Sequence, residues 1–228
     1  MLEVQGVEGG YGHAKILNNV SIKLRKGQIV SVVGPNGAGK STLMKAIFGL
    51  VHVTKGRVFL EGNEITNLAP EALVKQGMAY VPQINNVFPS LSMLENLEMG
   101  AYIRKDNYRK RIEEMFTLFP DLRDRPKRPA GQLSGGQRNM LAMARALMLD
   151  TRVLLLDEPT AGLAPKVTLT VWECIQSICP SGVAVLVVEQ NTRMALERSE
   201  LVTGRNRFEG PGSELIESKE VTNLYLGQ

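Results

Sequence analysis

Short apolar runs bounded by glycine and charged residues characterise the first sixty residues of the chain. Four such runs, at residues 2–7, 18–24, 28–33 and 56–62, contain mainly valine, isoleucine and leucine as their apolar residues. This composition between turn residues predicts β-strands. The stretch from about Ser92 to Asp150 differs, because its pattern predicts mostly helices.

Two strongly apolar strands are predicted in the second half of the chain, at residues 152–159 (RVLLLDEP) and 183–190 (VAVLVVEQ). A helix-like segment separates them. Apolar strands that alternate with helices are typical of a parallel sheet covered on both faces. The fold class that follows is α/β with a mostly parallel sheet, and residues 84–150 are predicted to form a helical insertion in it. Residues 212–228 suggest two short terminal helices.

Length and composition narrow the classes of protein that fit. The chain has 228 residues, of which 43% are hydrophobic, so it can bury a substantial core. Its apolar stretches, such as residues 183–188, are far shorter than the roughly 20 residues that span a bilayer. The first ten residues lack the basic start and apolar core of a signal peptide. We therefore expect neither secretion nor membrane insertion.

The cysteines and the charge add two further expectations. Cys174 and Cys179 do not form a Cys-x-x-Cys pair, so we expect reduced cysteines that serve packing. The net charge is +4, and basic residues concentrate at residues 104–111 and 121–129. Nucleic acid or an anionic membrane surface would attract such segments. Interspersed acidic residues favour a solvated helical face instead, and we expect no nucleic-acid partner.

A glycine-rich motif, Gly34-x-x-x-x-Gly39-Lys40-Ser41, lies between the predicted strand at residues 28–33 and a helix-like pattern. In this context the glycines let backbone N–H groups turn inward around phosphates, and the helix N-terminus adds partial positive charge. Lys40 is expected to reach the β- and γ-phosphates, and the Ser41 hydroxyl to ligate Mg²⁺. The alternative is an incidental lysine beside a turn. The residues expected to bind nucleotide here are Gly34, Pro35, Asn36, Gly37, Ala38, Gly39, Lys40, Ser41 and Thr42.

The strand at residues 152–159 ends in two carboxylates. Asp157 would lie at the carboxyl edge of the sheet, where α/β folds bind ligands, and would hold Mg²⁺. Glu158 is then placed to accept a proton from an attacking water. The alternative is a solvent-facing acidic pair at a strand end. Together the two motifs indicate a nucleoside triphosphatase, and the absence of an Asn-Lys-x-Asp guanine reader argues against a GTPase.

The sequence Leu-Ser-Gly-Gly-Gln at residues 133–137 precedes a helix whose apolar positions, Leu141, Ala144, Leu147 and Met148, share one face. Ser134 stands where an N-cap is expected, and the glycines bare the first N–H groups of the helix. Such a terminus can bind a phosphate. Taken by itself, an ordinary serine-capped helix would be the better interpretation.

The order and spacing of these motifs closely resemble those of ATP-binding cassette (ABC) ATPases, over essentially the whole chain. The resemblance implies one ABC-type P-loop domain over residues 1–228. Residues 1–83 and 151–228 would form its nucleotide-binding core with an N-terminal antiparallel β subdomain, and residues 84–150 a helical subdomain. It also implies ATP, Mg²⁺ and a head-to-tail dimer. The residues that would touch the γ-phosphate held by a second ATPase subunit are Ser134, Gly135, Gly136 and Gln137.

Other positions gain roles from the same resemblance. Tyr11 stands where an aromatic ring stacks on adenine, and a turn tyrosine is the alternative. Gln83 matches the glutamine that senses Mg²⁺ and water and couples the site to a transport channel; the alternative is a polar residue after a strand. Val87, Phe88 and Pro89 would form an apolar loop that receives a short helix of a membrane partner. Packing of Phe88 in the helical core is an equal alternative.

Gln190 stands where the family usually has a histidine that contacts the γ-phosphate, and the two histidines, His13 and His52, lie elsewhere. The sequence TAGLAP at residues 160–165 also departs from the family. Both departures resemble one branch, the ATPase subunits of importers of branched-chain and neutral amino acids and of urea importers. In that branch two different ATPase chains usually pair beneath two different permease chains, and a periplasmic binding protein delivers the substrate.

Glutamine can replace part of the histidine's role. Its NH₂ group donates a hydrogen bond as imidazole does, but it does not become cationic near pH 7. We expect Gln190 to act with Glu158 and Gln83 in catalysis, as a γ-phosphate donor in a slower site. The alternative is that Gln190 and Asn191 only cap the helix that starts near Thr192.

The resulting expectation is an ATP-hydrolysing subunit of a prokaryotic amino-acid importer, peripheral on the cytoplasmic face of the inner membrane. Its partners would be transmembrane permease subunits and a second ATPase, either a different chain or a copy. Alternatives are an importer ATPase for urea or another small solute, and a non-transport ABC ATPase for assembly or DNA. The segment at residues 195–210 is shorter than is usual in the family, and residues 199–204 suggest a truncated strand.

Overall fold

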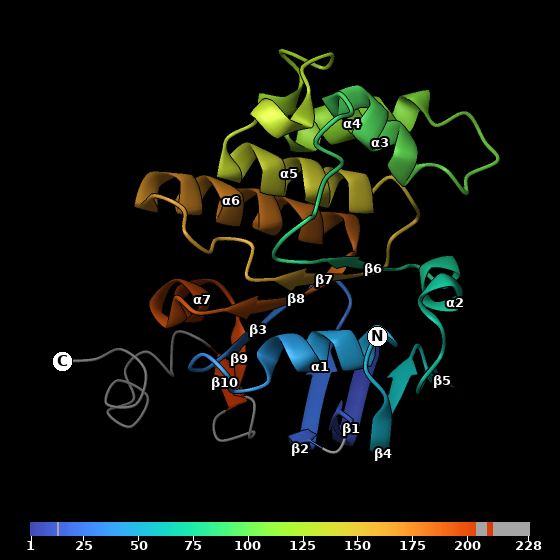
Figure 1. Ribbon diagram of the computed structural model, residues 1–228, viewed down its shortest axis with the longest axis vertical. Coiled ribbons are helices and arrows are strands. Elements are labelled where there is room, and N and C mark those ends of the chain that lie inside the picture. The colour runs from blue at the N-terminus through green and yellow to red at the C-terminus, as the bar shows by residue number, and fades with distance from the viewer. Residues whose placement is uncertain (13, 204–208, 212–228) are drawn as a thin grey trace.

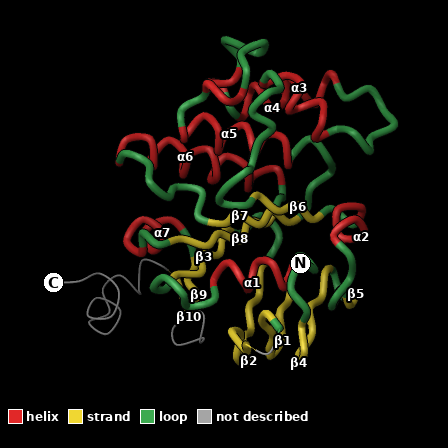
Figure 2. Tube along the Cα trace, in the orientation of Figure 1, coloured by secondary structure: helices red, strands yellow, loops and turns green. Residues whose placement is uncertain are grey.

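The computed structural model describes residues 1–12, 14–203 and 209–211. Figures 1 and 2 show two sheets, with α1 (Lys40–Ile47) between them and a group of helices on the far side of the larger sheet. The predicted terminal helices at residues 212–228 lie outside the described residues, as does His13.

The smaller sheet is antiparallel, and apolar and polar residues alternate along its first strand. Leu2 and Val4 are buried whereas Gln5 is exposed, so one face of the sheet packs and the other meets water. The register pairs Leu2 with Leu24 on one neighbour and with Leu60 on the other. The strand order is β2 (Ala14–Leu24), β1 (Leu2–Tyr11), β4 (Val53–Leu60) and β5 (Asn63–Glu64).

Strand β1 continues past residue 7, the end that the apolar pattern predicts, to Tyr11. This extension contains Gly9 and Gly10, which have no side chain and so add nothing to the apolar pattern. At Gly10 a Cβ atom would lie 1.9 Å from the carbonyl oxygen of Ala14 on β2, so only glycine permits this close approach.

The larger sheet is parallel except at one edge, as its apolar strands predict. Its carboxyl ends are aligned, because Val33 pairs with Glu189 and Asp157 pairs with Val188. The short β9 confirms a strand within residues 199–204 and pairs in parallel with β3. The strand order is β10 (Glu209–Pro211), β9 (Glu200–Thr203), β3 (Ile29–Val33), β8 (Ala184–Glu189), β7 (Val153–Asp157) and β6 (Met78–Val81).

Both faces of this sheet are buried, which explains the uninterrupted apolar runs. Successive residues of a strand point to opposite faces. On β7, Leu154 and Leu156 belong to a core shared with the upper helices, whereas Val153 and Leu155 belong to a core shared with α1 and the antiparallel sheet. The charged residue of this strand, Asp157, stands at its end.

The helices cover the sheet where the 3.6-residue pattern predicts them. Leu141, Ala144, Leu147 and Met148, the predicted apolar face, are all buried. Among the described residues no helix is long and apolar enough to span a bilayer. The helices are α2 (Pro70–Lys75), α3 (Met93–Gly100), α4 (Arg109–Leu118), η1 (Pro120–Leu122), η2 (Ala130–Gln132), α5 (Gly135–Ala146), α6 (Pro165–Ile178), η3 (Cys179–Ser181) and α7 (Thr192–Arg198).

The two cysteines are unpaired, as expected for reduced packing residues. Cys174 is buried on α6 and Cys179 is half-buried beside it. Burial raises the pKa of each thiol to about 11, with nearby carboxylates adding to the effect at Cys174. The thiolate is the reactive form, so the raised pKa values disfavour reaction of both side chains at neutral pH.

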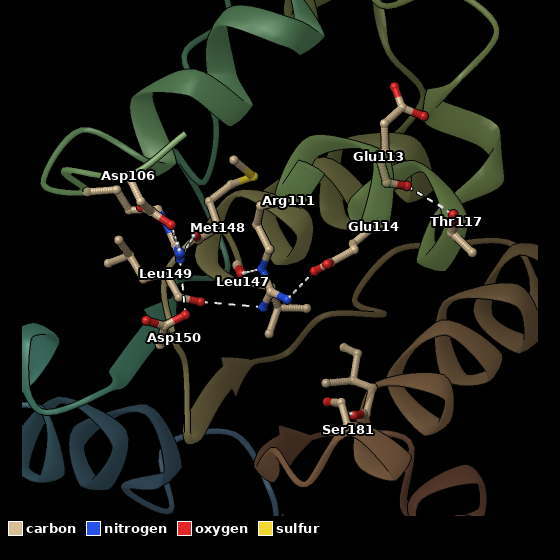
Figure 3. A network of polar contacts seen from close by, with 12 residues as sticks. Asp106, Arg111, Glu113, Glu114, Thr117, Leu147, Met148, Leu149, Asp150 and Ser181 are labelled. Carbon is tan, nitrogen blue, oxygen red and sulfur yellow. Dashed lines mark hydrogen bonds and ion pairs between the residues drawn. The ribbon is translucent and has the colours of Figure 1, made fainter. Parts of the chain in front are cut away.

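The basic stretch at residues 104–111 is only partly the solvated face that its composition predicts. Lys105 and Lys110 are exposed, but the interpretation is wrong for Arg104 and Arg111. Arg111 donates from Nε to the carbonyl of Leu147 (Figure 3). Arg104 donates to the carbonyl of Met148. The last carbonyls of a helix need donors from outside it, so the two arginines hold the end of α5.

Candidate functional site

The glycine-rich loop joins β3 to α1 at the carboxyl edge of the parallel sheet. Gly37 and Gly39 have φ angles of 78° and 90°, which side-chain-bearing residues rarely adopt, so glycine is needed at both positions. Residues 35–38 are exposed, whereas Lys40 is 5% exposed. Its ammonium donates to the carbonyls of Gly34 and Pro35 inside the curve of the loop. Burial lowers the pKa of Lys40, and nearby carboxylates oppose this shift.

Ser41 and Asp157 meet although 116 positions separate them in the sequence. The Ser41 hydroxyl donates to Oδ1 of Asp157 at 2.8 Å, and Tyr80 on β6 donates to Oδ2 at 3.0 Å. Desolvation, followed by the charge of Asp157, raises the pKa of Tyr80, so its hydroxyl remains a donor. Sequence reasoning missed Tyr80, because a tyrosine in an apolar strand is an ordinary core residue unless the neighbouring strand is known.

These oxygen donors fit Mg²⁺. Mg²⁺ takes few protein ligands, usually one or two carboxylates together with substrate phosphates. The residues that would hold the ion are Ser41 and Asp157, beside the loop that would hold the phosphates. Gln83, which the resemblance also assigns to Mg²⁺, donates to Glu158 in this structure. Within the described residues no group of three or more His, Cys, Asp or Glu side chains is arranged so that it could hold a metal ion.

Glu158 is held in an unusual backbone conformation. Its φ of 50° lies in the left-handed region, which costs free energy for a residue with a side chain. The N–H of Glu158 donates to the carbonyl of Val188 on the neighbouring strand at 2.9 Å. The turn directs a carboxylate that is only 7% exposed toward two glutamines.

Gln83 and Gln190 converge on one oxygen of that carboxylate. Nε2 of Gln83 donates to Oε2 of Glu158 at 2.8 Å, and Nε2 of Gln190 donates to the same atom at 2.5 Å. The structure thus brings together the three residues expected to act in catalysis. Asn191 alone supplies the side-chain cap of α7, accepting from the N–H of Met194 at 3.2 Å. The alternative in which the Gln190 side chain only caps this helix is therefore wrong.

A buried acid that sequence reasoning missed lies directly behind these residues. Glu189, the last residue of β8, is 2% exposed and accepts hydrogen bonds from Thr160, from N at 3.2 Å and from Oγ1 at 2.8 Å. Burial raises its pKa to about 7; the bonds from Thr160 oppose this shift and the charge of Glu158 adds to it. The sequence signal for Glu189 was its position at the end of an apolar strand, but the functional interpretation was given to the next residue, Gln190.

Ser134 is the N-cap of α5, as predicted. Its hydroxyl accepts from the N–H of Gln137 at 3.3 Å, and the Gln137 side chain accepts from the N–H of Ser134 at 3.2 Å. The glycines also permit close packing, because a Cβ at Gly135 would lie 2.8 Å from Leu163 and one at Gly136 would lie 2.3 Å from Val167. Among the described residues, no hydrogen bond joins this motif to the glycine-rich loop.

The remaining candidate residues lie at three places. Thr42 is buried in α1, one residue after Ser41. Tyr11 is 48% exposed at the tip of the hairpin formed by β1 and β2. Phe88 is 42% exposed, so the alternative that places it in the core is wrong; the guanidinium of Arg145 covers its ring at 4.8 Å instead.

Comparison with known proteins defines the class. The family model described as ABC transporter matches residues 17–161, more than half of the chain. The chain therefore belongs to the ABC transporter family and is an ATPase of the ATP-binding cassette type, a domain that binds nucleotide. The resemblance and the α/β fold class are confirmed.

Particular relatives are similar over their whole length. The chain is 46% identical over 233 residues to the probable branched-chain amino acid transport ATP-binding protein LivF of Archaeoglobus fulgidus, covering 100% of this chain and 99% of the relative. It is 38% identical to the high-affinity branched-chain amino acid transport ATP-binding protein BraG of Pseudomonas aeruginosa, with 100% of both covered.

Solved structures agree. A nucleotide-free ATP-binding cassette from an ABC transporter matches with a TM-score of 0.85 at 28% identity, covering 100% of this chain and 99% of the other. An ATP-binding cassette in its ADP conformation matches with a TM-score of 0.87 at 27% identity and the same coverage.

Proposed function

We propose that the chain hydrolyses Mg-ATP as the energising subunit of an importer of branched-chain or other neutral amino acids. The observation that carries the hydrolytic part is the convergence of Gln83 and Gln190 on Oε2 of Glu158, beside the Ser41–Asp157 pair. The names of the two full-length relatives support the substrate class.

The glycine-rich loop binds the triphosphate through its backbone N–H groups and through Lys40. Ser41 and Asp157 hold Mg²⁺, and Tyr80 keeps the Asp157 carboxylate in place. When bound, the ion neutralises charge that develops on the phosphates. Tyr11 stacks on the adenine from the exposed hairpin tip.

Glu158 orients and polarises the attacking water. Both glutamines bind Oε2, so they fix the plane of the carboxylate and leave Oε1 as the oxygen that faces water. The NH₂ group of Gln190 has two hydrogens. One donates to Glu158 and the second donates to the γ-phosphate, so that Gln190 bridges base and substrate without carrying charge.

A second ATPase subunit completes the site. Ser134, Gly135, Gly136 and Gln137 contact the γ-phosphate held by that subunit, since an exposed helix N-terminus is a phosphate site. The second subunit is a different chain or a copy of this one. Permease subunits bind the surface at Phe88, which is exposed and apolar. The chain works as a peripheral subunit on the cytoplasmic face of the membrane, where ATP is available. A periplasmic or surface binding protein delivers the amino acid.

The test is reconstitution in proteoliposomes with the permease chains, the partner ATPase and the binding protein. We expect ATP hydrolysis stimulated by leucine, isoleucine or valine, accompanied by uptake, and loss of both with Glu158→Gln. Stimulation of hydrolysis by urea alone would show that the chain energises a urea importer instead of an amino-acid importer. A stable, active complex that forms without any membrane subunit would contradict transport altogether.

A further inference from the structure

Three segments of the chain meet at one side chain, that of Asn139 on α5. Its Nδ2 donates to the carbonyl of Pro159, and its Oδ1 accepts from Nδ2 of Asn86 at 2.7 Å. Asn86 is 4% exposed and follows Gln83 by three residues, whereas Pro159 directly follows Glu158. One amide therefore links the helix behind Ser134 to the two segments that carry Gln83 and Glu158.

The contacts form a closed ring. Gln83 binds Glu158 directly, and Asn86 reaches the next residue, Pro159, through Asn139. The backbones at residues 83–86 and 158–159 are thus joined at two points rather than one. Two attachments fix an orientation, whereas a single hydrogen bond leaves a hinge.

The ring acts where the backbone is strained. Glu158 has a φ of 50°, a conformation that persists only if its surroundings hold it. Its N–H is held by Val188, and the carbonyl of the following Pro159 is held by Asn139. The side chain of Glu158 branches from the backbone between these two anchors, so a change at either one turns Oε2 away from Gln83 and Gln190.

The chemistry of the contact requires an amide. Asn139 donates in one direction and accepts in the other, which only a carboxamide of this length does here. Aspartate has the same shape but would set a carboxylate oxygen against the Pro159 carbonyl. The pair borders a cleft of about 480 Å³ lined by Gln83, Asn86 and Asn139, so this exchange does not disturb a dry core.

We propose that Asn139 is a positioning residue for hydrolysis: its amide sets the backbone at Pro159 and thereby the carboxylate of Glu158. The inference rests on the proposed role of Glu158. It adds a route by which the position of α5, which carries the signature motif, governs the water-activating group of the same subunit.

The experiment measures steady-state ATP hydrolysis in the assembled transporter for wild type, Asn139→Asp, Asn86→Ala and the double variant Asn139→Asp/Asn86→Ala. For Asn139→Asp we expect kcat to fall about 10- to 100-fold, because small misplacements of a catalytic group have effects of this size. We expect KM for ATP and the affinity for a fluorescent ATP analogue to stay within about twofold. The double variant should be no slower than Asn139→Asp, because both changes break one ring.

The matched control is Asn107→Asp in the loop before α4. Asn107 is exposed and accepts from the N–H of Arg109, which aspartate can also do, so the kcat of Asn107→Asp should equal that of wild type.

The variant Glu158→Gln distinguishes failure of the proposed function from failure of the positioning role. If Glu158→Gln keeps wild-type activity, the proposed function of Glu158 fails. If it is inactive but Asn139→Asp keeps wild-type kcat, or loses nucleotide affinity in proportion to kcat, only the positioning role is overturned. Multiplicative effects in the double variant would also overturn it.

Discussion

At the scale of single residues, the site is an arrangement of neutral amides around one carboxylate. Gln83 and Gln190 donate to Glu158, and neither changes its charge with pH near neutrality. A histidine at position 190 would instead couple the geometry of the site to its own protonation. In this site the two glutamines orient the Glu158 carboxylate but do not themselves gain or lose protons.

The first prediction concerns Gln190. In the assembled transporter, Gln190→Ala should slow hydrolysis about 10- to 100-fold, since a hydrogen bond to a charged group contributes roughly 1.5–3 kcal/mol. Glu158→Gln defines the floor of the assay. Steady-state kinetics check the effect, and a rate equal to that of wild type would show that the contact with Glu158 has no part in catalysis.

The second prediction concerns Glu189 and pH. The pKa of this carboxyl is about 7 in the folded chain against an ordinary value of 4.5, so between these values the folded chain binds more protons than the unfolded chain. Its contribution to stability is therefore present at about pH 4.5, falls as pH rises and is lost above about pH 7. Glu189→Gln cannot ionise, so it should gain about 1–3 kcal/mol over wild type between pH 5 and pH 8.

Urea unfolding at the two pH values measures this gain. Glu71→Gln, an exposed carboxyl at the start of α2, is the control and should show no comparable gain. Equal stability of Glu189→Gln and wild type at both pH values would contradict the shift. The charges that act on or with Glu189 in this balance are those of Glu158 and Lys40.

At the scale of elements, α5 is held at both ends by side chains from other segments. Asn139 lies near its start, and Arg104 and Arg111 bind the carbonyls that follow its last turn. Arg104 also pairs with Asp106 at 2.7 Å and with Asp150 at 3.1 Å. These contacts give Arg104 and Arg111 a structural role within this basic stretch.

The third prediction tests this anchor. Arg111→Ala should lower the free energy of unfolding by about 1–3 kcal/mol, because it leaves carbonyls at the end of α5 without donors. Arg109→Ala, which removes an exposed arginine from the same helix, should cost less than about 0.5 kcal/mol. Urea denaturation of the two variants makes the comparison, and equal losses would contradict a specific role for Arg111.

The elements also show where prediction from sequence reaches its limit. Strand ends are visible in a sequence, so the meeting of Ser41 with Asp157 and the placement of Glu158 at the sheet edge followed from apolar runs and motif context. The lateral order of strands is not visible. The contact of Tyr80 with Asp157 depends on β6 lying beside β7, and that of Asn139 with Pro159 on the docking of α5.

At the scale of the whole molecule, several large apolar side chains of the helical segment are exposed and are candidates for contact with a partner protein. Besides Phe88, the side chains of Met99, Tyr102 and Ile103 are 44%, 82% and 49% exposed. All four belong to the helical segment, on the far side of the parallel sheet from the antiparallel strands. A permease subunit is the partner proposed for Phe88, and burial of such side chains would drive its binding.

The fourth prediction concerns that surface. Phe88→Asp should prevent co-purification with the permease chains, while affinity for nucleotide stays unchanged, because Phe88 is not among the residues assigned to the nucleotide site. Leu169→Asp is the matched control, since Leu169 is 41% exposed on α6 and should leave assembly intact. Normal assembly of Phe88→Asp would place the permease contact elsewhere.

The side-chain contacts along α5 have a consequence for how the helix transmits movement. The helix carries Arg145 against Phe88 and Asn139 against Pro159, and these two positions are six residues apart, about 9 Å along the axis. Because neighbouring turns of a helix are joined by hydrogen bonds, we expect a displacement of Phe88 to reach the turn beside Glu158 through Arg145 and Asn139. Helix α5 would therefore connect movement of the surface at Phe88 to the position of the Glu158 carboxylate.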